Sequence, residues 1–584
     1  MRSWLAVTLL VTTTWVARGR TSEPIDPPYD PTEAQDPVTP DDEATDAPPP
    51  PEGALEVVLQ QGRIRTVAQK ADWRRHQVYA FKGIPYARPP VGDLRLRDPV
   101  AAPPWPGVRD GTVTPRRCPQ REYEGGSFVT RGQEDCLFLS VYTPKPTPTA
   151  AFPVLVWFHG GGFKSGSGAP HPRLADGGAL VVVAVQYRLG LLGFLSTEDA
   201  VLPGNLGLKD QAMALRWVKD NIRDLGGDPD KVTIFGESAG GASVHFHILS
   251  PGSKGLFARA ILQSGSALCP WATAANHAKM AIEVLQKLNC SDASFPPLDS
   301  QGLLRCLQET PMHVLLELPS AELKISEFAP RVDGAFLPAP PATLLQEGRY
   351  SAVDILTGTA QHEGAAFVDY FFSRAEFQRY VTDHFPTAVP EMLFLEDGDS
   401  PADLARRIFF QFVGGLRASW DDEEALVEMF GQRFNIVCQD ETALLHARTS
   451  PDKKVFAYEF RHRPSGRERY VGHLDDLPFL FEVDAAPLSR PEDVFVSHLM
   501  TAMWTNFAKT GNPTPDLALG FRWAPMASGC LSFLAITPTP TMHHDTRREV
   551  RAFWSHLPLP QNRLLYPALF APDVAPMPCP GVGG

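Results

Sequence analysis

The stretch Val232-Thr-Ile-Phe-Gly236-Glu-Ser238-Ala-Gly240-Gly241 decides the fold of this chain. Four β-prone residues lead into Gly-x-Ser-x-Gly, and the helix-compatible run 242–246 follows. This order predicts a nucleophile elbow: a strand, a sharp strained turn with Ser238 at its tip, and then a helix. Gly236 and Gly240 are expected where the strand and helix backbones come too close for side chains. Because so short a motif also occurs by chance, its surroundings in the chain decide what it means.

Continuous apolar runs on both sides of the elbow predict strands that are buried on both faces. They are residues 153–158, 180–186 and 258–264, and residues 210–221 have apolar side chains at helical spacing. Such alternation predicts an α/β fold with an open, mostly parallel sheet and helices on both faces. Residues 55–59 and 62–67 are expected to pair as antiparallel strands. Beyond residue 270 the pattern is mainly helical, with further strands at 354–358 and 454–460, which predicts a helical cover over the sheet.

The two ends of the chain differ from the part between them. Met1–Gly19 has a basic start, a short apolar core and small residues near its end, which predicts a signal peptide and a secreted protein. Residues 20–52 are rich in proline and acidic side chains, which predicts disorder. Residues 53–570 are interpreted as one catalytic domain and 571–584 as a flexible tail. No uninterrupted apolar run is long enough for a membrane span.

Composition limits the partners of this 584-residue chain. Its 43% hydrophobic content is typical of a globular protein, and its net charge of −13 argues against nucleic acid as a partner. Eight cysteines fit an oxidising compartment. Cys118 with Cys136, and Cys290 with Cys306, enclose short loops that suit bridges; Cys269, Cys438, Cys530 and Cys579 stay unassigned. No pair has zinc-site spacing, and one glycosylation sequon begins at Asn289.

A glycine run stands upstream of the elbow, directly after a predicted buried strand. It reads His159-Gly-Gly-Gly-Phe163. Glycines leave the backbone N–H groups unobstructed, so the amides of Gly161 and Gly162 are expected to form an oxyanion hole together with that of Ala239. A glycine run alone is usually a flexible loop. Its position before the Gly-x-Ser-x-Gly strand makes the pair of motifs far more specific.

The sequence resembles the type-B carboxylesterases, which share an α/β-hydrolase fold with the cholinesterases. The resemblance covers roughly residues 54–570. Within the family, the sequence most resembles secreted carboxylesterases of invertebrates. Its motifs occur in the family's order: Phe81-Lys-Gly-Ile-Pro-Tyr-Ala87, Glu134-Asp-Cys-Leu137, the glycine run, Gln186-Tyr-Arg-Leu-Gly190, Gly204-Asn-Leu-Gly-Leu-Lys-Asp-Gln211, the elbow, Gln263-Ser-Gly-Ser266 and Trp504-Thr-Asn-Phe-Ala-Lys-Thr-Gly-Asn512.

Enzymes of this kind need an acid and then a base after the serine. His473 stands in Tyr470-Val-Gly-His-Leu-Asp-Asp-Leu-Pro-Phe-Leu-Phe481, where acidic residues and an aromatic-apolar run follow the histidine, which resembles the family's base motif. Leu474 replaces the glycine that the family usually has there. Glu363 matches the family's acid, a glutamate before glycine. The alternatives are His498 for the base, and Asp333 or Asp369 for the acid.

The resemblance also implies supporting residues. Glu237 and Ser264 are expected behind the reacting groups, and a glutamate satisfied by structural hydrogen bonds is an equal alternative for Glu237. Ion pairs Arg88–Glu134 and Arg188–Asp210 are implied, as are the bridges Cys118–Cys136 and Cys290–Cys306. The family's third bridge needs a cysteine just before Phe553-Trp554, where this chain has Arg551, so Cys438 is expected to be unpaired or to pair differently.

The predicted function is hydrolysis of a small-molecule carboxylic ester through an acyl-enzyme on Ser238, without metal or cofactor. A cholinesterase is one alternative, but the loop between Cys118 and Cys136 lacks the tryptophan with which that subfamily binds quaternary ammonium. A non-catalytic adhesion protein is another, although such relatives lack the serine and typically add a membrane span. The sequence does not identify the physiological ester or the oligomeric state.

Overall fold

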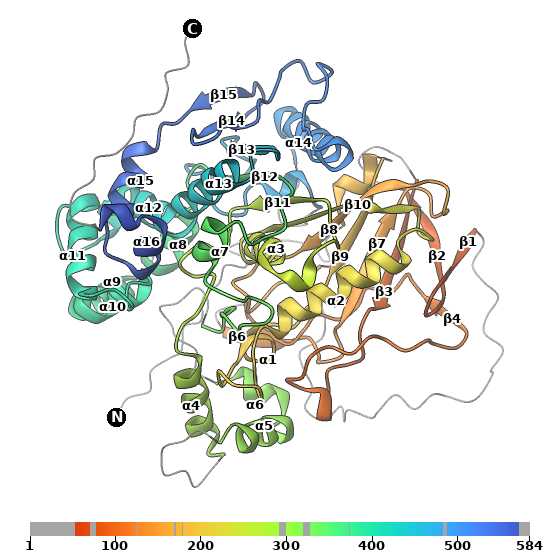
Figure 1. Cartoon of the computed structure of the whole chain (residues 1–584), viewed down its shortest axis with the longest axis horizontal. Helices are drawn as coiled ribbons and strands as arrows, with labels where there is room; N and C mark the ends of the chain where they lie inside the picture. The colour runs from red at the N-terminus through yellow and green to blue at the C-terminus, as the bar shows by residue number, and fades with distance from the viewer. Residues whose placement is uncertain are drawn as a thin grey trace.

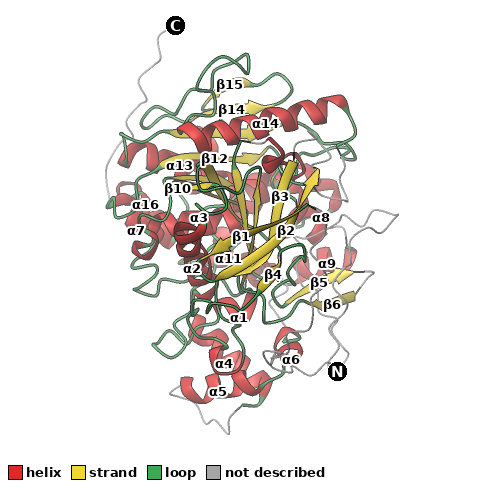
Figure 2. Ribbon diagram, turned by 90° about the vertical axis from the view of Figure 1, so that its right-hand side faces the viewer, coloured by secondary structure: helices red, strands yellow, loops and turns green. Residues whose placement is uncertain are grey.

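The computed structural model describes residues 53–70, 77–124, 127–168, 171–177, 179–290, 299–318, 327–372, 374–482 and 488–570. The predicted signal peptide (1–19), the proline-rich acidic segment (20–52) and the tail (571–584, with Cys579) lie outside these ranges. Figures 1 and 2 show the described elements gathered around one large twisted sheet.

Thirteen strands of the described part form that sheet, in the order β1-β2-β3-β7-β9-β8-β10-β11-β12-β13-β14-β15, with β4 beside β2. Neighbours from β9 to β14 pair in parallel, whereas β1-β2-β3-β7-β9 and β14-β15 pair antiparallel. The hairpin β5-β6 is separate. The bounds are β1 Ala54–Leu59, β2 Gly62–Lys70, β3 Gln77–Pro85, β4 Val108–Asp110, β5 Gln120–Glu124, β6 Ser127–Arg131, β7 Phe138–Thr143, β8 Phe152–Phe158, β9 Val181–Val185, β10 Gly227–Glu237, β11 Arg259–Gln263, β12 Asp354–Ala360, β13 Val455–Phe460, β14 Ser532–Ile536 and β15 Thr541–His544.

Both faces of the sheet are buried, and β8 shows why its sequence is uniformly apolar. Val154, Val156 and Phe158 belong to the apolar cluster on one face. Leu155 and Trp157, which alternate with them, belong to the cluster on the other face. Successive side chains of a strand point to opposite faces, so a strand covered on both faces needs an apolar residue at every position.

Helices cover each face and extend beyond one end of the sheet. Residues of α2 and α3 pack in the first cluster, and residues of α14 pack in the second. A third cluster, rich in phenylalanine, fills the helical cover. The bounds are α1 Gly190–Phe194, α2 Leu206–Asn221, α3 Ala239–Leu249, α4 His277–Leu288, α5 Ser300–Glu309, α6 Met312–Leu316, α7 Pro341–Gln346, α8 Ala365–Phe372, α9 Ala375–Asp383, α10 Phe385–Met392, α11 Pro401–Phe412, α12 Glu423–Gly431, α13 Val437–Thr449, α14 Pro491–Thr510, α15 Arg548–Ser555 and α16 Pro560–Leu565.

The predicted fold class is confirmed: the chain has a large, mostly parallel sheet with helices around it. Helix 277–288 has the predicted helical character, and the predicted buried strands 153–158 and 258–264 differ from β8 and β11 by about one residue at their ends. Sequence patterns did not predict α14 as a helix, nor the edge strands β14 and β15. No helix among the described residues has the length and apolar character needed to cross a membrane.

Three disulfides join described residues. Cys118–Cys136 and Cys290–Cys306 are the pairs that the resemblance implies, and Cys269–Cys438 answers a pairing that the sequence left open. The implied ion pair Arg188–Asp210 is confirmed at 2.6 Å. The implied pair Arg88–Glu134 is wrong: Glu134 pairs with buried Arg95 at 2.6 Å, because Arg95 also reaches the carbonyls of Leu307 and Thr310, whereas Arg88 is exposed.

Arg551, which replaces the family's cysteine, joins α15 to α13 by charge. Its Nη1 lies 3.3 Å from Asp440 Oδ2 and 3.0 Å from Asp545 Oδ1. Arg547 contacts the other oxygen of Asp440 at 2.6 Å and Glu459, at the end of β13, at 2.5 Å. Arg551 is only 8% exposed, so these charges are held largely away from water and each depends on its partners.

Replacing Arg551 with alanine should therefore destabilise the protein. We expect Arg551→Ala to lower the free energy of unfolding by about 3 kcal/mol, because it takes one cation from buried Asp440 and leaves half-buried Asp545 without its cation. Arg406→Ala, which removes an exposed i,i+3 pair with Asp403, should cost no more than about 0.5 kcal/mol. Urea unfolding of both variants measures this. Equal small losses would show that the buried cluster contributes little.

Candidate active site

The elbow occupies the point where β10 ends and α3 begins. Ser238, between them, has φ 56° and ψ −121°, a conformation that L-residues avoid. A Cβ at Gly240 would lie 2.0 Å from the carbonyl oxygen of Phe158, and one at Gly236 would lie 2.4 Å from that of Gly240. Only glycine fits these positions, so the strained turn follows from the sequence. Ser238 itself is 4% exposed.

The glycine run leaves the end of β8 and lies against the elbow. A Cβ at Gly160 would lie 3.1 Å from Cβ of Ser238 and 2.7 Å from the carbonyl oxygen of Glu237. Gly161 and Gly162 both have positive φ, 107° and 60°. Within the described residues the amides of Gly161, Gly162 and Ala239 donate no backbone or side-chain hydrogen bond. These three donors remain free to bind a negatively charged oxygen.

Glu363 and His473 meet after the ends of β12 and β13. His473 Nδ1 donates to Glu363 Oε2 across 2.6 Å. The other oxygen of Glu363 accepts from Ser264 Oγ at 2.5 Å and from the amide of Ala360 at 2.7 Å. A carboxylate held by three donors fixes the imidazole ring and keeps the proton on Nδ1, which leaves Nε2 as the basic nitrogen.

Glu237 faces that second nitrogen. Its Oε1 lies 3.2 Å from His473 Nε2, but the contact lacks hydrogen-bond geometry, and among the described residues neither atom has a hydrogen-bond partner. Ser238 Oγ is likewise not hydrogen-bonded to His473 there. The bond between nucleophile and base is often long without substrate and shortens when substrate is bound. The structure thus brings Glu363, His473, Glu237 and Ser264 into contact and places Ser238 beside them in the elbow.

Burial and neighbouring charges both shift the pKa values of Glu237 and His473. Burial raises the pKa of Glu237 well above its ordinary value, and nearby Asp476 adds to the rise. Burial lowers the pKa of His473, but the carboxylates of Glu237 and Glu363 outweigh it and raise this pKa to about 9. Glu237 and His473 therefore titrate as a coupled pair, in which the charge on one decides the protonation of the other.

The alternatives considered from the sequence lie elsewhere. Asp333 accepts from the amides of Ala335 and Leu337 in a turn. Asp369 is exposed on α8, and His498 lies on α14. The structure brings none of them to His473, whose carboxylate contacts within the described part are with Glu363 and Glu237.

Sequence reasoning missed two buried polar groups beside the site. Asp476 accepts from Gln263 Nε2 at 2.8 Å and from Tyr458 OH at 3.0 Å, and burial raises the pKa of its carboxyl to about 6. Asn435 donates to the carbonyl oxygen of Ser264 at 2.5 Å. The acidic pair after His473 signalled Asp476. No local pattern signals Asn435, whose partner lies 171 residues away. No three His, Cys, Asp or Glu residues of the described part are grouped to hold a metal ion.

The turn after His473 accommodates Leu474, the residue that stands where the family usually has glycine. Leu474 has φ 75°, the left-handed region in which glycine is favoured. Asp475 holds the turn, since its Oδ2 accepts from the amide of Gly472 at 2.7 Å and its Oδ1 contacts Arg467 at 2.7 Å. The loop therefore keeps the glycine geometry although it has a leucine, at a cost in backbone strain.

Because of this strain, glycine should be more stabilising than alanine at position 474, the reverse of their order inside a helix. Leu474→Gly should be more stable to urea than Leu474→Ala by about 1 kcal/mol, because alanine keeps the Cβ that the left-handed conformation disfavours. At exposed Gln286, inside α4, alanine should instead be the more stable by about 1 kcal/mol. The same order at both positions would show that Leu474 is not strained.

Comparison with known proteins places this chain in a family. Residues 53–554 match the Carboxylesterase family. The chain is 35% identical over 485 residues to Esterase FE4 of Myzus persicae, covering 77% of this chain and 83% of that protein. It is 33% identical over 538 residues to bile salt-activated lipase of Homo sapiens, covering 86% of this chain and 70% of the lipase. The chain therefore belongs to the carboxylesterase family and is a carboxylic-ester hydrolase.

Proposed function

We propose that the protein is a secreted serine carboxylesterase that hydrolyses small-molecule esters through an acyl-enzyme on Ser238. The contact between His473 Nδ1 and Glu363 Oε2, at 2.6 Å beside a strained serine elbow, is the observation that supports this most strongly. It is the arrangement by which an acid orients a base toward a serine nucleophile.

In the proposed reaction, Ser238 Oγ attacks the ester carbonyl while His473 Nε2 takes its proton. Glu363 keeps the imidazole oriented and stabilises the imidazolium that forms, without taking the proton itself. The amides of Gly161, Gly162 and Ala239 stabilise the negative oxygen of the tetrahedral intermediate. His473 then gives its proton to the departing alcohol and afterwards activates the water that releases the acid.

Glu237 is proposed to adjust the basicity of His473. Its carboxylate stands 3.2 Å from Nε2, the nitrogen that must exchange protons with Ser238. An ionised Glu237 stabilises the imidazolium, whereas a protonated Glu237 does not. Ser264 is proposed as a positioning residue, because its hydroxyl holds Glu363 and its carbonyl is held by Asn435.

Secretion is proposed from the N-terminal sequence, and the three disulfides are compatible with it. Asn289 is exposed at the end of α4, and it is proposed as a glycosylation site. The adjacent Cys290 is bonded to Cys306.

Hydrolysis of p-nitrophenyl butyrate tests the catalytic assignments. Ser238→Ala and His473→Ala should each lower kcat by at least ~10⁴-fold, because nucleophile and base act as a unit. Glu363→Gln should cost ~10³ to 10⁴-fold, since the imidazole loses its orienting charge. Asp369→Asn, at the exposed alternative, should change kcat less than about twofold. If Ser238→Ala and the original chain were equally active, the serine mechanism would be wrong.

The pH dependence tests the role of Glu237. His473 accepts a proton only when neutral, so kcat/KM should rise as pH passes upward through its apparent pKa. Glu237→Gln removes a negative charge beside Nε2, lowers the pKa of His473 and should move this rise to lower pH. Glu347→Gln, which removes an exposed carboxylate paired with Arg349, is the matched control and should leave the profile unchanged. A profile that does not move in Glu237→Gln would contradict the proposed coupling.

A further inference from the structure

A small cavity lies away from the site described above. Its walls come from the segment after β11, from the turn between α12 and α13, and from α13, α15 and α16. They include Leu268, Arg433, Glu441, Trp554 and Leu565. The centre of a water-sized molecule can move within about 40 Å³ of it. None of Ser238, Glu363 or His473 lines it.

Arg433 brings an unbalanced positive charge to this cavity. Its Nε donates to the carbonyl oxygen of Leu393 at 2.8 Å and its Nη2 to that of Phe394 at 2.7 Å. Its guanidinium carbon lies 5.8 Å from the centre of the Trp554 ring. No carboxylate pairs with Arg433 in the part of the chain that the structure describes. Burial lowers the pKa of Arg433 to about 10, and no neighbouring charge opposes this.

Other buried arginines of the same region are all balanced. Arg547 pairs with Asp440 and Glu459, and Arg551 pairs with Asp440 and Asp545. Glu441, the carboxylate that also lines the cavity, has Arg551 Nε at 3.8 Å as its own cation. A partly buried guanidinium without a counter-ion is costly, and an anion in the cavity would remove that cost.

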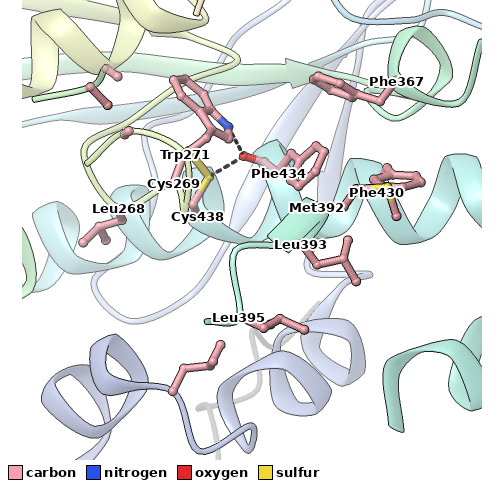
Figure 3. Packing of buried hydrophobic residues seen from close by; sticks show 14 of the residues in the cluster. Leu268, Cys269, Trp271, Phe367, Met392, Leu393, Leu395, Phe430, Phe434 and Cys438 are labelled. Carbon is pink, nitrogen blue, oxygen red and sulfur yellow. Dashed lines mark hydrogen bonds between the residues drawn. A yellow bond between two sulfur atoms is a disulfide. The ribbon is translucent and has the colours of Figure 1, made fainter. Parts of the chain in front are cut away.

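The wall also has an apolar part, beside polar groups such as Gln432, Gln561 and Asn562. Leu268, Val437 and Leu565 are apolar, and Cys438 contributes its disulfide with Cys269. Figure 3 shows Leu268, Cys269 and Cys438 together, with Trp271 donating to the carbonyl oxygen of Phe434. A guanidinium with free donor capacity beside these apolar side chains suits a carboxylate that carries a short hydrocarbon chain.

We propose that this cavity binds a short-chain monocarboxylate through Arg433, the class of acid that ester hydrolysis releases. The position of Arg433 connects the cavity with the catalytic centre. Residues Gln432–Ile436 form a π-helical turn, a feature that often marks functional sites. Asn435, on the same turn, holds the carbonyl of Ser264, whose hydroxyl binds Glu363.

Titration calorimetry of the full chain with propionate tests the proposal. Arg433→Gln should weaken propionate binding at least ~10-fold, because it removes a charged hydrogen-bond donor. Arg448→Gln is the matched control: it removes an exposed arginine of neighbouring α13 and should leave the affinity within about twofold. Propionamide, which has nearly the same shape without the charge, should bind at least ~10-fold more weakly than propionate.

A second variant keeps the proposal testable if Arg433→Gln does not fold. Val437→Phe adds bulk to the cavity wall without changing any charge, so it should also weaken propionate binding while Arg433 is retained. The proposal is overturned if the unchanged protein takes up no propionate at concentrations up to about 50 mM. It is also overturned if Arg433→Gln or Val437→Phe binds propionate as tightly as the unchanged protein, or if propionamide binds equally well. Because binding is read without substrate turnover, these results do not depend on whether Ser238 is the nucleophile.

Discussion

The close approach of three backbones at the elbow is the constraint on which the rest of the structure depends. Gly236 and Gly240 let the end of β10 and the start of α3 meet the carbonyl of Phe158 at the end of β8. Any side chain there would push these segments apart. Because they meet, the glycine run, Ser238 and Glu237 lie side by side, and the parallel strands on the far side, β12 and β13, deliver Glu363 and His473 to the same edge of the sheet. Ligand sites of open α/β sheets lie at this carboxyl edge.

Negative charge is concentrated around one imidazole. Glu237, Glu363 and Asp476 are each at most 1% exposed, and all three influence His473. Two of them are held by donors: Glu363 by Ser264 and Ala360, and Asp476 by Gln263 and Tyr458. Glu237 has no such donors among the described residues. Of the three carboxylates it is the one whose charge is least fixed by the fold and most open to change when a substrate enters.

Features that depend on neighbouring residues alone could be predicted from the sequence. Glycine spacing gave the elbow and the glycine run, and uninterrupted apolar runs gave strands buried on both faces, such as β8. The partner of His473 came from resemblance, since no pattern connects Glu363 with a residue 110 positions later. Pairings that depend on tertiary contacts were missed or wrong. Glu134 pairs with Arg95 and not with Arg88, because the carbonyls of Leu307 and Thr310 also bind Arg95. The Cys269–Cys438 bridge joins residues 169 positions apart. The edge strands β14 and β15 are short, and residues of β15 are largely exposed, so apolar runs did not reveal them.

Arg551 changes how the last part of the chain is attached. Where the family has a cysteine, α15 is joined to α13 and β13 through carboxylates and guanidinium groups instead. A covalent bridge at this place would have to await an oxidant and could form with a wrong partner, such as Cys269, on the way. An ion pair forms without an oxidant and cannot be diverted to a wrong thiol. The attachment of α15 to α13 through Arg551 therefore coexists with the bond of Cys438 to Cys269 and does not depend on thiol chemistry.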